Sequence, residues 1–252
     1  MEHHEVFVAA VFNRLIVWLA SLFGYHLSPE VLPAHVVMVI IVGLTLIVLS
    51  LLARKRFNVE DPGAVQQFLE LWAEGTMGLA RDIIGGAAVR FFPLLGGLFL
   101  YILLGNVLGM LPGFMSPTSN LNVTGSCAIV VFFYYNYVGF RTHGFLKYLG
   151  HFAGPSLAIA PLLFVIEIIS HFARPVSLSV RLFGNIYAEE TIIGTLNGMF
   201  PFVLSLPVMG LALFASTIQA FIFIVLTMVY LGGALEHGPE EEGPEPSRGL
   251  SP

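Results

Sequence analysis

The stretch VVMVIIVGLTLIVLSLLA, residues 36–53, decides the fold class of this chain. It carries no charged residue and approaches the roughly 20 residues that a helix needs to cross about 30 Å of hydrocarbon. The whole chain shares this character, because 56% of its 252 residues are hydrophobic and only 11% are charged. Soluble domains carry about 25% charged residues. The sequence therefore predicts an all-α integral membrane protein embedded in a lipid bilayer.

Two further apolar runs follow at spacings that suit membrane helices. Residues 91–111 (FFPLLGGLFLYILLGNVLGML) are closed by Pro112 and Gly113, and residues 123–140 read VTGSCAIVVFFYYNYVGF. Each run is about as long as the hydrocarbon layer requires. They predict the second and third membrane spans.

The last two apolar segments, 155–194 and 201–235, are too long for a simple crossing. As straight helices they would reach roughly 50–60 Å, so each fits a bilayer only if it is strongly tilted or bent. Pro175 is a position where the first can bend, because proline removes a backbone donor. The alternative splits each segment into two spans, but no polar turn separates the halves. We expect about five crossings, with the last two long and strongly tilted.

The two ends of the chain differ from this central domain of residues 31–236. Residues 1–30 lack the positive start of a signal peptide, and 6–24 predict an amphipathic helix at the membrane surface or on the bundle, with a short extra span as the alternative. Residues 237–252 are rich in Pro, Gly and Glu and predict a disordered acidic tail. No motif for nucleic acid, a metal or another cofactor is present, and the lone Cys127 is expected to be a small apolar residue.

Basic residues set the expected orientation. Cytoplasmic loops carry an excess of Lys and Arg. Among the loop residues, Arg54, Lys55 and Arg56 follow the first span, Arg81 and Arg90 lie in the connection 57–90, and Arg141 and Lys147 follow the third span, whereas 112–122 and 195–203 contain no Lys or Arg. With five crossings the N-terminus lies outside and the C-terminus in the cytoplasm. The connection 57–90 mixes acidic and apolar residues, which predicts an amphipathic helix on the cytoplasmic face.

Ionisable residues inside membrane helices are costly and usually mark an ion path. Here they concentrate in residues 164–195. Counted from Arg181, most polar residues of this segment recur at helical spacing and share one stripe, whereas Glu190 falls on the far side. The segment contains Glu167, Ser170, His171, Arg174, Ser177, Arg181, Asn185, Glu189 and Glu190.

A polar stripe has two interpretations. It can hold helices together, with Glu167–Arg174 or Arg181–Glu189 as ion pairs, or it can line an ion path, which the number of charges favours. His171 can gain or lose a proton near neutral pH, or it can simply satisfy the hydrogen bonding of a neighbouring group. In the last helix Gln219 has several hydrogen-bonding positions amid apolar residues, so it needs a partner on another helix, and the stripe around Arg181 is the expected one.

Longer motifs in this region resemble a known family. The strings PVSLSVRLFGNIYAEE (175–190) and IQAFIFIVLTMVYL (218–231) closely resemble subunit a of F-type ATP synthases of the bacterial type. GNVLGMLPG (105–113) and NVTGSCA (122–128) match the same family in order. The resemblance runs from about residue 90 to 237.

The resemblance implies a stator subunit beside a ring of c subunits, held by the b subunits of a peripheral stalk in a bacterial inner membrane. Two aqueous half-channels would lead protons to carboxylates on the ring, and the subunit would catalyse no reaction by itself. The essential arginine corresponds to Arg181. Asn185, Glu190 and Gln219 correspond to channel residues, and the polar residues along 167–177 would line the cytoplasmic exit.

The chain departs from the family at two positions. Glu189 stands where Gly or His is common, and Ala212 stands where the final helix often carries His or Glu. The outer proton path is therefore expected to depend on Glu189, Glu190 and water, with the main relay left open between the two. The coupling ion, proton or sodium, and the ring size also stay open.

The resemblance also implies how the parts act together. Arg181 would favour the ionised form of an approaching ring carboxylate and repel hydronium. The rival interpretations are a self-contained secondary transporter or channel with a buried Arg–Glu site, and a structural anchor subunit whose polar stripe is purely adhesive. Co-purification with a c ring and a stalk distinguishes them from a stator.

Overall fold

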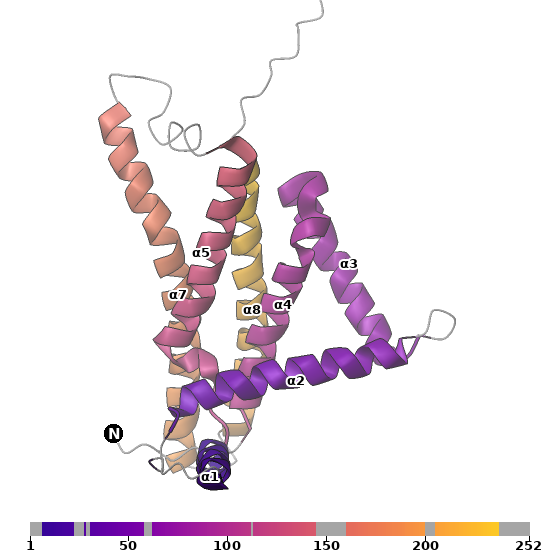
Figure 1. Cartoon of the computed structure of the whole chain (residues 1–252), viewed down its shortest axis with the longest axis vertical. Helices are drawn as coiled ribbons and strands as arrows, with labels where there is room; N and C mark the ends of the chain where they lie inside the picture. The colour runs from indigo at the N-terminus through magenta and orange to yellow at the C-terminus, as the bar shows by residue number, and fades with distance from the viewer. Residues whose placement is uncertain are drawn as a thin grey trace, which may run out of the picture.

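The computed structural model describes residues 7–22, 28, 31–57, 62–111, 113–144, 160–199 and 205–236. Within these residues the chain is helical and contains no strand, as predicted (Figure 1). The acidic tail predicted over 237–252 lies outside the described residues. In chain order the elements are α1 (Phe7–Leu22), α2 (Ala34–Arg56), α3 (Ala64–Ile84), the short 3₁₀ helix η1 (Gly85–Ala87), α4 (Ala88–Gly109), the 3₁₀ helix η2 (Pro117–Ser119), α5 (Leu121–His143), α7 (Ala160–Met199) and α8 (Ser205–Glu236).

The three predicted spans before residue 145 are confirmed as the helices α2, α4 and α5. In the described part of the chain, four segments are long and apolar enough to cross a membrane: Ala34–Arg54, Leu69–Gly109, Leu121–Thr142 and Leu206–Leu235. The second includes most of α3, which folds back against α4 (Figure 1). α7, the fifth expected crossing, is not among the four and carries five charged residues, so its crossing stays a prediction.

The last two helices are continuous, as the missing turn signals predicted. α7 has 40 residues and α8 has 32. At 1.5 Å per residue they are roughly 60 Å and 48 Å long, well above the hydrocarbon thickness. α7 continues through Pro175, which lies inside it. The alternative of four shorter spans is therefore wrong.

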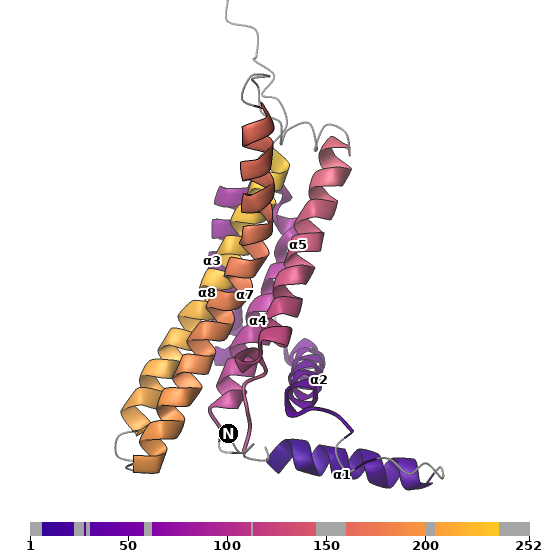
Figure 2. The ribbon, with the colours of Figure 1, turned by 90° about the vertical axis from the view of Figure 1, so that its left-hand side faces the viewer.

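α2 runs in a different direction from the other long helices (Figure 1). α4, α5, α7 and α8 lie side by side, whereas α2 runs across them and is seen end-on when the molecule is turned (Figures 1 and 2). α2 therefore cannot run along the membrane normal if α7 and α8 also run along it. The 23 residues of α2 match one direct crossing. α4 and α5, which lie beside α7 and α8, match a direct crossing equally well with 22 and 23 residues, so the strong tilt of α7 and α8 stays a prediction.

The packed core lies where α4, α5, α7 and α8 meet. Large side chains from all four helices are almost fully buried there: Phe91, Tyr135, Leu182 and Phe223 are at most 2% exposed. Lipid tails are as apolar as these residues, so close packing rather than water exclusion stabilises the contact. Cys127 lies in this core as the small apolar residue that the sequence predicted.

Local signals fix the ends of the elements. The Asn120 side chain accepts a hydrogen bond from the Asn122 backbone N–H at 2.9 Å and so caps α5. α3 ends at Gly85, whose positive φ of 74° suits glycine. The charged residues of α3 are exposed, and its Trp72 stacks on Phe99 of α4 with centroids 4.6 Å apart. The predicted amphipathic helix is confirmed, and its cytoplasmic location stays a prediction.

α1 packs crosswise at one end of the bundle (Figure 2). The side chain of Asn13 bonds both backbone groups of Leu32, donating to its oxygen at 2.9 Å and accepting from its N–H at 3.1 Å. With 16 residues, or roughly 24 Å, α1 is too short to span the hydrocarbon alone. This favours the prediction of a packed or surface helix over an extra span.

Candidate functional site

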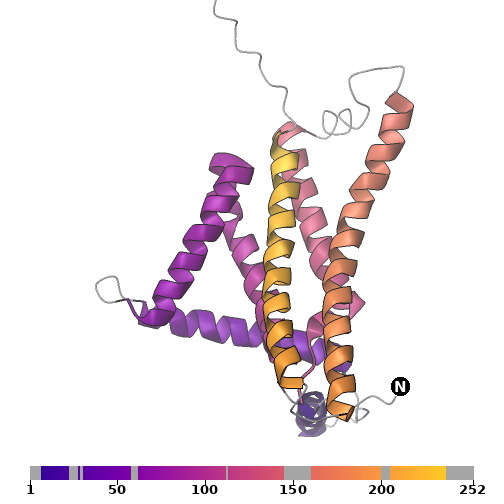
Figure 3. The same ribbon diagram turned by 180° about the vertical axis from the view of Figure 1, so that it is seen from behind.

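The polar residues predicted for function spread along α7 and the neighbouring face of α8. The two helices run side by side in opposite directions, with no other described helix in front of them in Figure 3. The polar residues form three groups. The N-terminal cluster is Glu167, Ser170, His171, Arg174 and Ser177. The arginine site is Arg181 with Asn185 and Gln219. The carboxylate cavity is the hollow lined by Glu189 and Glu190.

At the arginine site, α7 and α8 are joined by two amide side chains. Asn185 Nδ2 donates a hydrogen bond of 2.8 Å to Gln219 Oε1, and Gln219 is only 3% exposed. The prediction that Gln219 finds its partner in the stripe around Arg181 is confirmed. Asn185 lies four residues after Arg181, so this bond fixes α8 one helical turn from the arginine.

Arg181 itself points away from the protein core. Its side chain is exposed, whereas its neighbour Leu182 is completely buried. In the part of the chain that the structure describes, the guanidinium forms no ion pair, and the pair with Glu189 that an adhesive stripe would need is not formed. Small exposed residues lie above and below it on the same face, namely Ala173, Ser177, Gly184 and Ala188. Another helix can approach such a face closely.

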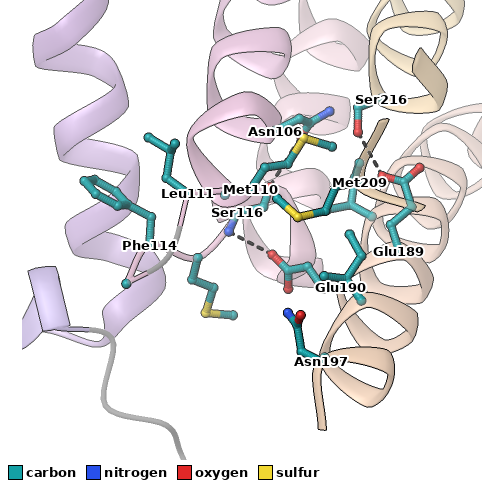
Figure 4. Close-up of a pocket in the computed structure, with 16 residues that line it drawn as sticks. Asn106, Met110, Leu111, Phe114, Ser116, Glu189, Glu190, Asn197, Met209 and Ser216 are labelled. Carbon is teal, nitrogen blue, oxygen red and sulfur yellow. Dashed lines mark hydrogen bonds between the residues drawn. The ribbon is translucent and has the colours of Figure 1, made fainter. Parts of the chain in front are cut away.

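Glu189 and Glu190 lie about one helical turn beyond Asn185 and accept hydrogen bonds from different parts of the structure. Ser216 of α8 donates its hydroxyl to Glu189 Oε2 at 2.9 Å. The backbone N–H of Ser116, in the connection between α4 and α5, donates to Glu190 Oε1 at 2.8 Å. Glu190 therefore falls on the other side of α7 from the arginine stripe, as its spacing predicted. Both bonds are visible in Figure 4.

Both carboxylates nevertheless line one cavity of about 410 Å³. Its walls combine methionines and other apolar side chains with a few polar groups (Figure 4). The polar lining residues are Asn106, Ser116, Glu189, Glu190, Asn197 and Ser216. Among the described residues that line it there is no Lys, Arg or His. Carboxylates held by neutral donors beside a polar hollow can take up and release protons, and hydroxyl and amide groups can hold water.

Sequence reasoning missed the polar groups of the α4–α5 connection, residues 110–120. Asn106 is 2% exposed, its Oδ1 accepts from the Thr118 hydroxyl, and its Nδ2 has no hydrogen-bond partner within the described structure. A buried amide donor without a partner beside a polar cavity indicates a place for water. An asparagine inside the otherwise apolar run 91–111 was the available signal.

The N-terminal cluster is only partly assembled. Arg174 and Glu167 form an ion pair with Nη2 and Oε1 3.6 Å apart, and both side chains are about one-third to two-fifths exposed, at 35% and 42%. The Arg174 guanidinium also lies over the ring of Tyr230 of α8, 5.7 Å from its centroid. Ser170 and Ser177 are exposed. The ion pair that the sequence allowed is therefore present, at the surface rather than in the core.

His171 is separated from those serines. It is 8% exposed and faces α5, where its Nε2 lies 2.9 Å from Asn136 Oδ1 and 3.4 Å from the Tyr135 hydroxyl. Rings of Phe132 and Tyr135 pack around it, with centroids 5.2 and 5.3 Å away. His171 thus forms hydrogen bonds with its neighbours on α5, and the interpretation that it titrates near neutrality stays open. A role in lining a channel stays a prediction.

Comparisons with known proteins agree on one family. A family profile described as ATP synthase A chain matches residues 35–232. The ATP synthase subunit a of Geotalea uraniireducens is 42% identical over 193 residues, which cover 77% of this chain and 83% of that protein. The subunit a of Syntrophobacter fumaroxidans is 41% identical over 244 residues, or 94% of this chain and 99% of that protein. The subunit a of Trichlorobacter lovleyi is 44% identical over 191 residues, covering 76% and 82%.

Proposed function

This chain belongs to the ATP synthase A chain family, and from that premise we propose that it is the stator subunit of the membrane proton channel of an F-type ATP synthase. In this role it provides two half-channels and the essential arginine that couples proton flow to rotation of a c ring. It performs no chemical conversion itself, and ATP is formed elsewhere in the complex. The integral membrane character follows from its apolar helices.

The observation that carries the proposal is that Arg181 is exposed and forms no ion pair in the described part of the chain. An arginine keeps its proton at any physiological pH, so its guanidinium is a fixed positive charge. Here that charge is exposed on an outward face of α7 and has no acid partner in the described part of its own chain. A charge inside a membrane needs a partner. A carboxylate on a neighbouring subunit meets that need, and the small residues around Arg181 allow its helix to come close.

The arginine then does two things. Its attraction favours the ionised form of the ring carboxylate that faces it, so that carboxylate releases its proton. Its repulsion of hydronium closes a direct leak between the half-channels. One charge crossing the membrane is worth about 2.3 kcal/mol per 100 mV, which can drive rotation only when the leak is closed. The Asn185–Gln219 bond supports this arrangement by fixing both long helices beside Arg181.

The carboxylate cavity fits the outer half-channel. With the N-terminus outside, α2 runs inward, α4 outward, α5 inward and α7 outward, so the α4–α5 connection and the C-terminal end of α7 share the outer side. That is where the cavity lies. Glu189 and Glu190 would pass protons inward with water held by Asn106. Glu167, Ser170 and Ser177 would line the cytoplasmic exit, with His171 and Arg174 beside them.

The proposed partners follow from the same assignment. They are the ring of c subunits against the face of Arg181, the b subunits of a peripheral stalk, and the lipid bilayer. We place the complex in a bacterial inner membrane with the C-terminus in the cytoplasm. A self-contained transporter with a buried Arg–Glu site is disfavoured, because within the described chain Arg181 is exposed and pairs with no glutamate.

The test uses the assembled ATP synthase in inverted membrane vesicles. Arg181→Ala is expected to abolish ATP-driven proton pumping, measured by quenching of a pH-sensitive dye, and to abolish coupled ATP synthesis. Arg141→Ala is the matched control, because Arg141 is an exposed arginine at the end of α5 that bonds only the Tyr137 hydroxyl in the described structure, at 3.1 Å. Normal pumping by the Arg181→Ala complex would refute the assigned role.

A further inference from the structure

Gly109, the last residue of α4, makes an unusually close contact with the α4–α5 connection. A Cβ placed on Gly109 would lie 2.5 Å from Ser116 Cβ and 2.6 Å from both Ser116 Cα and Ser116 N. Ordinary contacts of a Cβ lie at 3.4–4 Å. The clashing atoms belong to the backbone or adjoin it, so a side-chain rotation cannot relieve them. Any residue larger than glycine at position 109 must push the Ser116 backbone away by roughly 1 Å.

The atom that would be pushed is the one that holds Glu190. Ser116 N donates the 2.8 Å hydrogen bond to Glu190 Oε1. This donor belongs to the backbone, so the identity of residue 116 does not supply it. The position of the donor depends instead on how closely the connection can approach the end of α4.

The rest of Ser116 is tied to the α4 side of the cavity. Its hydroxyl shares a hydrogen bond of 2.7 Å with the Thr118 hydroxyl and lies 3.4 Å from Asn106 Oδ1. Ser116 is 2% exposed and Thr118 is fully buried. These contacts hold the connection against α4 and leave the N–H of Ser116 directed at α7. Gly109 provides the space in which this arrangement fits.

We propose that Gly109 is a positioning residue for Glu190, acting through the backbone N–H of Ser116. The inference rests on the proposed function, since it takes Glu190 to be a proton relay. Glu189 has no such arrangement, because its donor is the Ser216 side chain of α8. The α4–α5 connection therefore positions Glu190, whereas α8 positions Glu189.

The experiment uses four variants of the assembled complex in inverted vesicles. Gly109→Ala displaces the Ser116 backbone. Ser116→Pro removes the N–H at a position whose φ of −68° already suits proline. Ser116→Ala is its control, because it loses the hydroxyl and keeps the N–H. Gly97→Ala is the control for the glycine, since it lies in the same helix and an added Cβ there meets nothing within 4 Å.

Gly109→Ala and Ser116→Pro are expected to slow ATP-driven pumping roughly tenfold, the usual effect of losing a hydrogen bond to a charged group. Both are also expected to change the pH at which pumping is half-maximal. Gly97→Ala should keep the rate within about twofold and keep the wild-type pH profile, because it leaves the bond to Glu190 in place. Ser116→Ala loses the same hydroxyl contacts as Ser116→Pro but keeps the N–H, so it should lose clearly less activity than Ser116→Pro. If the Gly109→Ala complex does not assemble, the comparison of Ser116→Pro with Ser116→Ala tests the inference by itself.

A double-mutant cycle separates positioning from a general structural role. In a Glu190→Gln background, Gly109→Ala and Ser116→Pro should add less than about twofold, since the group they act on is already gone. Their full tenfold loss in that background would overturn the inference, as would a wild-type rate and pH profile for either variant alone. A full rate for Glu190→Gln itself would show instead that the proposed proton path is wrong, and the inference would fall with it.

Discussion

The two ends of α7 hold their charged residues in opposite ways. In the N-terminal cluster the charges satisfy each other, because Arg174 pairs with Glu167 at the surface, 3.6 Å apart. The charge of Glu167 is thus balanced within its own chain. At the other end Glu189 and Glu190 have only neutral donors in the described structure, namely Ser216 Oγ for Glu189 and the Ser116 N–H with the Ser119 hydroxyl for Glu190, beside a cavity of about 410 Å³. A carboxylate held by neutral donors can bind or release a proton without breaking an ion pair.

In the proposed function the two ends have separate tasks. The carboxylate cavity would take up protons, and the N-terminal cluster would line a partly exposed exit. Arg181 lies between the two ends of α7 and forms no ion pair with an acidic residue in the described part of the chain. Substitutions at each end of α7 test this difference.

The largest effect is expected at Glu190. Glu190→Gln removes the relay but keeps an oxygen that can accept the Ser116 N–H, so the fold is preserved while proton transfer is lost. Loss of a positioned proton-transfer group lowers rates by roughly a hundredfold or more. ATP-driven pumping in vesicles measures this. Glu74→Gln, an exposed change on α3, is the matched control and should pump normally.

A smaller effect is expected at Glu189. Its donor Ser216 is a side chain of α8, and the structure ties Glu189 to the α8 side of the cavity rather than to the α4–α5 connection. Glu189→Gln keeps an oxygen that can accept the Ser216 hydroxyl and leaves Glu190 in place, so it should slow pumping by less than the roughly hundredfold expected for Glu190→Gln. Equal and full activity in Glu189→Gln and Glu190→Gln would remove both carboxylates from the proton path.

The smallest effect is expected in the N-terminal cluster. Arg174→Gln breaks an ion pair whose partners are 35% and 42% exposed, and such pairs contribute less than about 1 kcal/mol. Pumping should fall by a factor of less than about five, and adding Glu167→Gln should not lower it much further. A loss as large as that of Glu190→Gln would contradict the contrast between the two ends.

Much of the fold followed from the sequence because each element had a local signal. Uncharged apolar runs predicted α2, α4 and α5, and the missing turn residues predicted the continuity of α7 and α8. The partner of Gln219 was predictable because a buried amide in an apolar helix has to be satisfied on another helix.

Other features had no such signal. One donor to Glu190 is a backbone N–H, a group that every residue except proline has. His171 lies one position from exposed Ser170, and only the packing of α5 decides that it is buried. The crosswise course of α2 depends on how whole helices pack, which no short motif records (Figure 1).

The most direct measurement is an experimental map of the assembled complex in a lipid bilayer. The account predicts that the Arg181 guanidinium lies deep in the membrane and faces a carboxylate on a helix of the c ring. A map in which the guanidinium is bound to Glu189, with no ring subunit alongside, would contradict it.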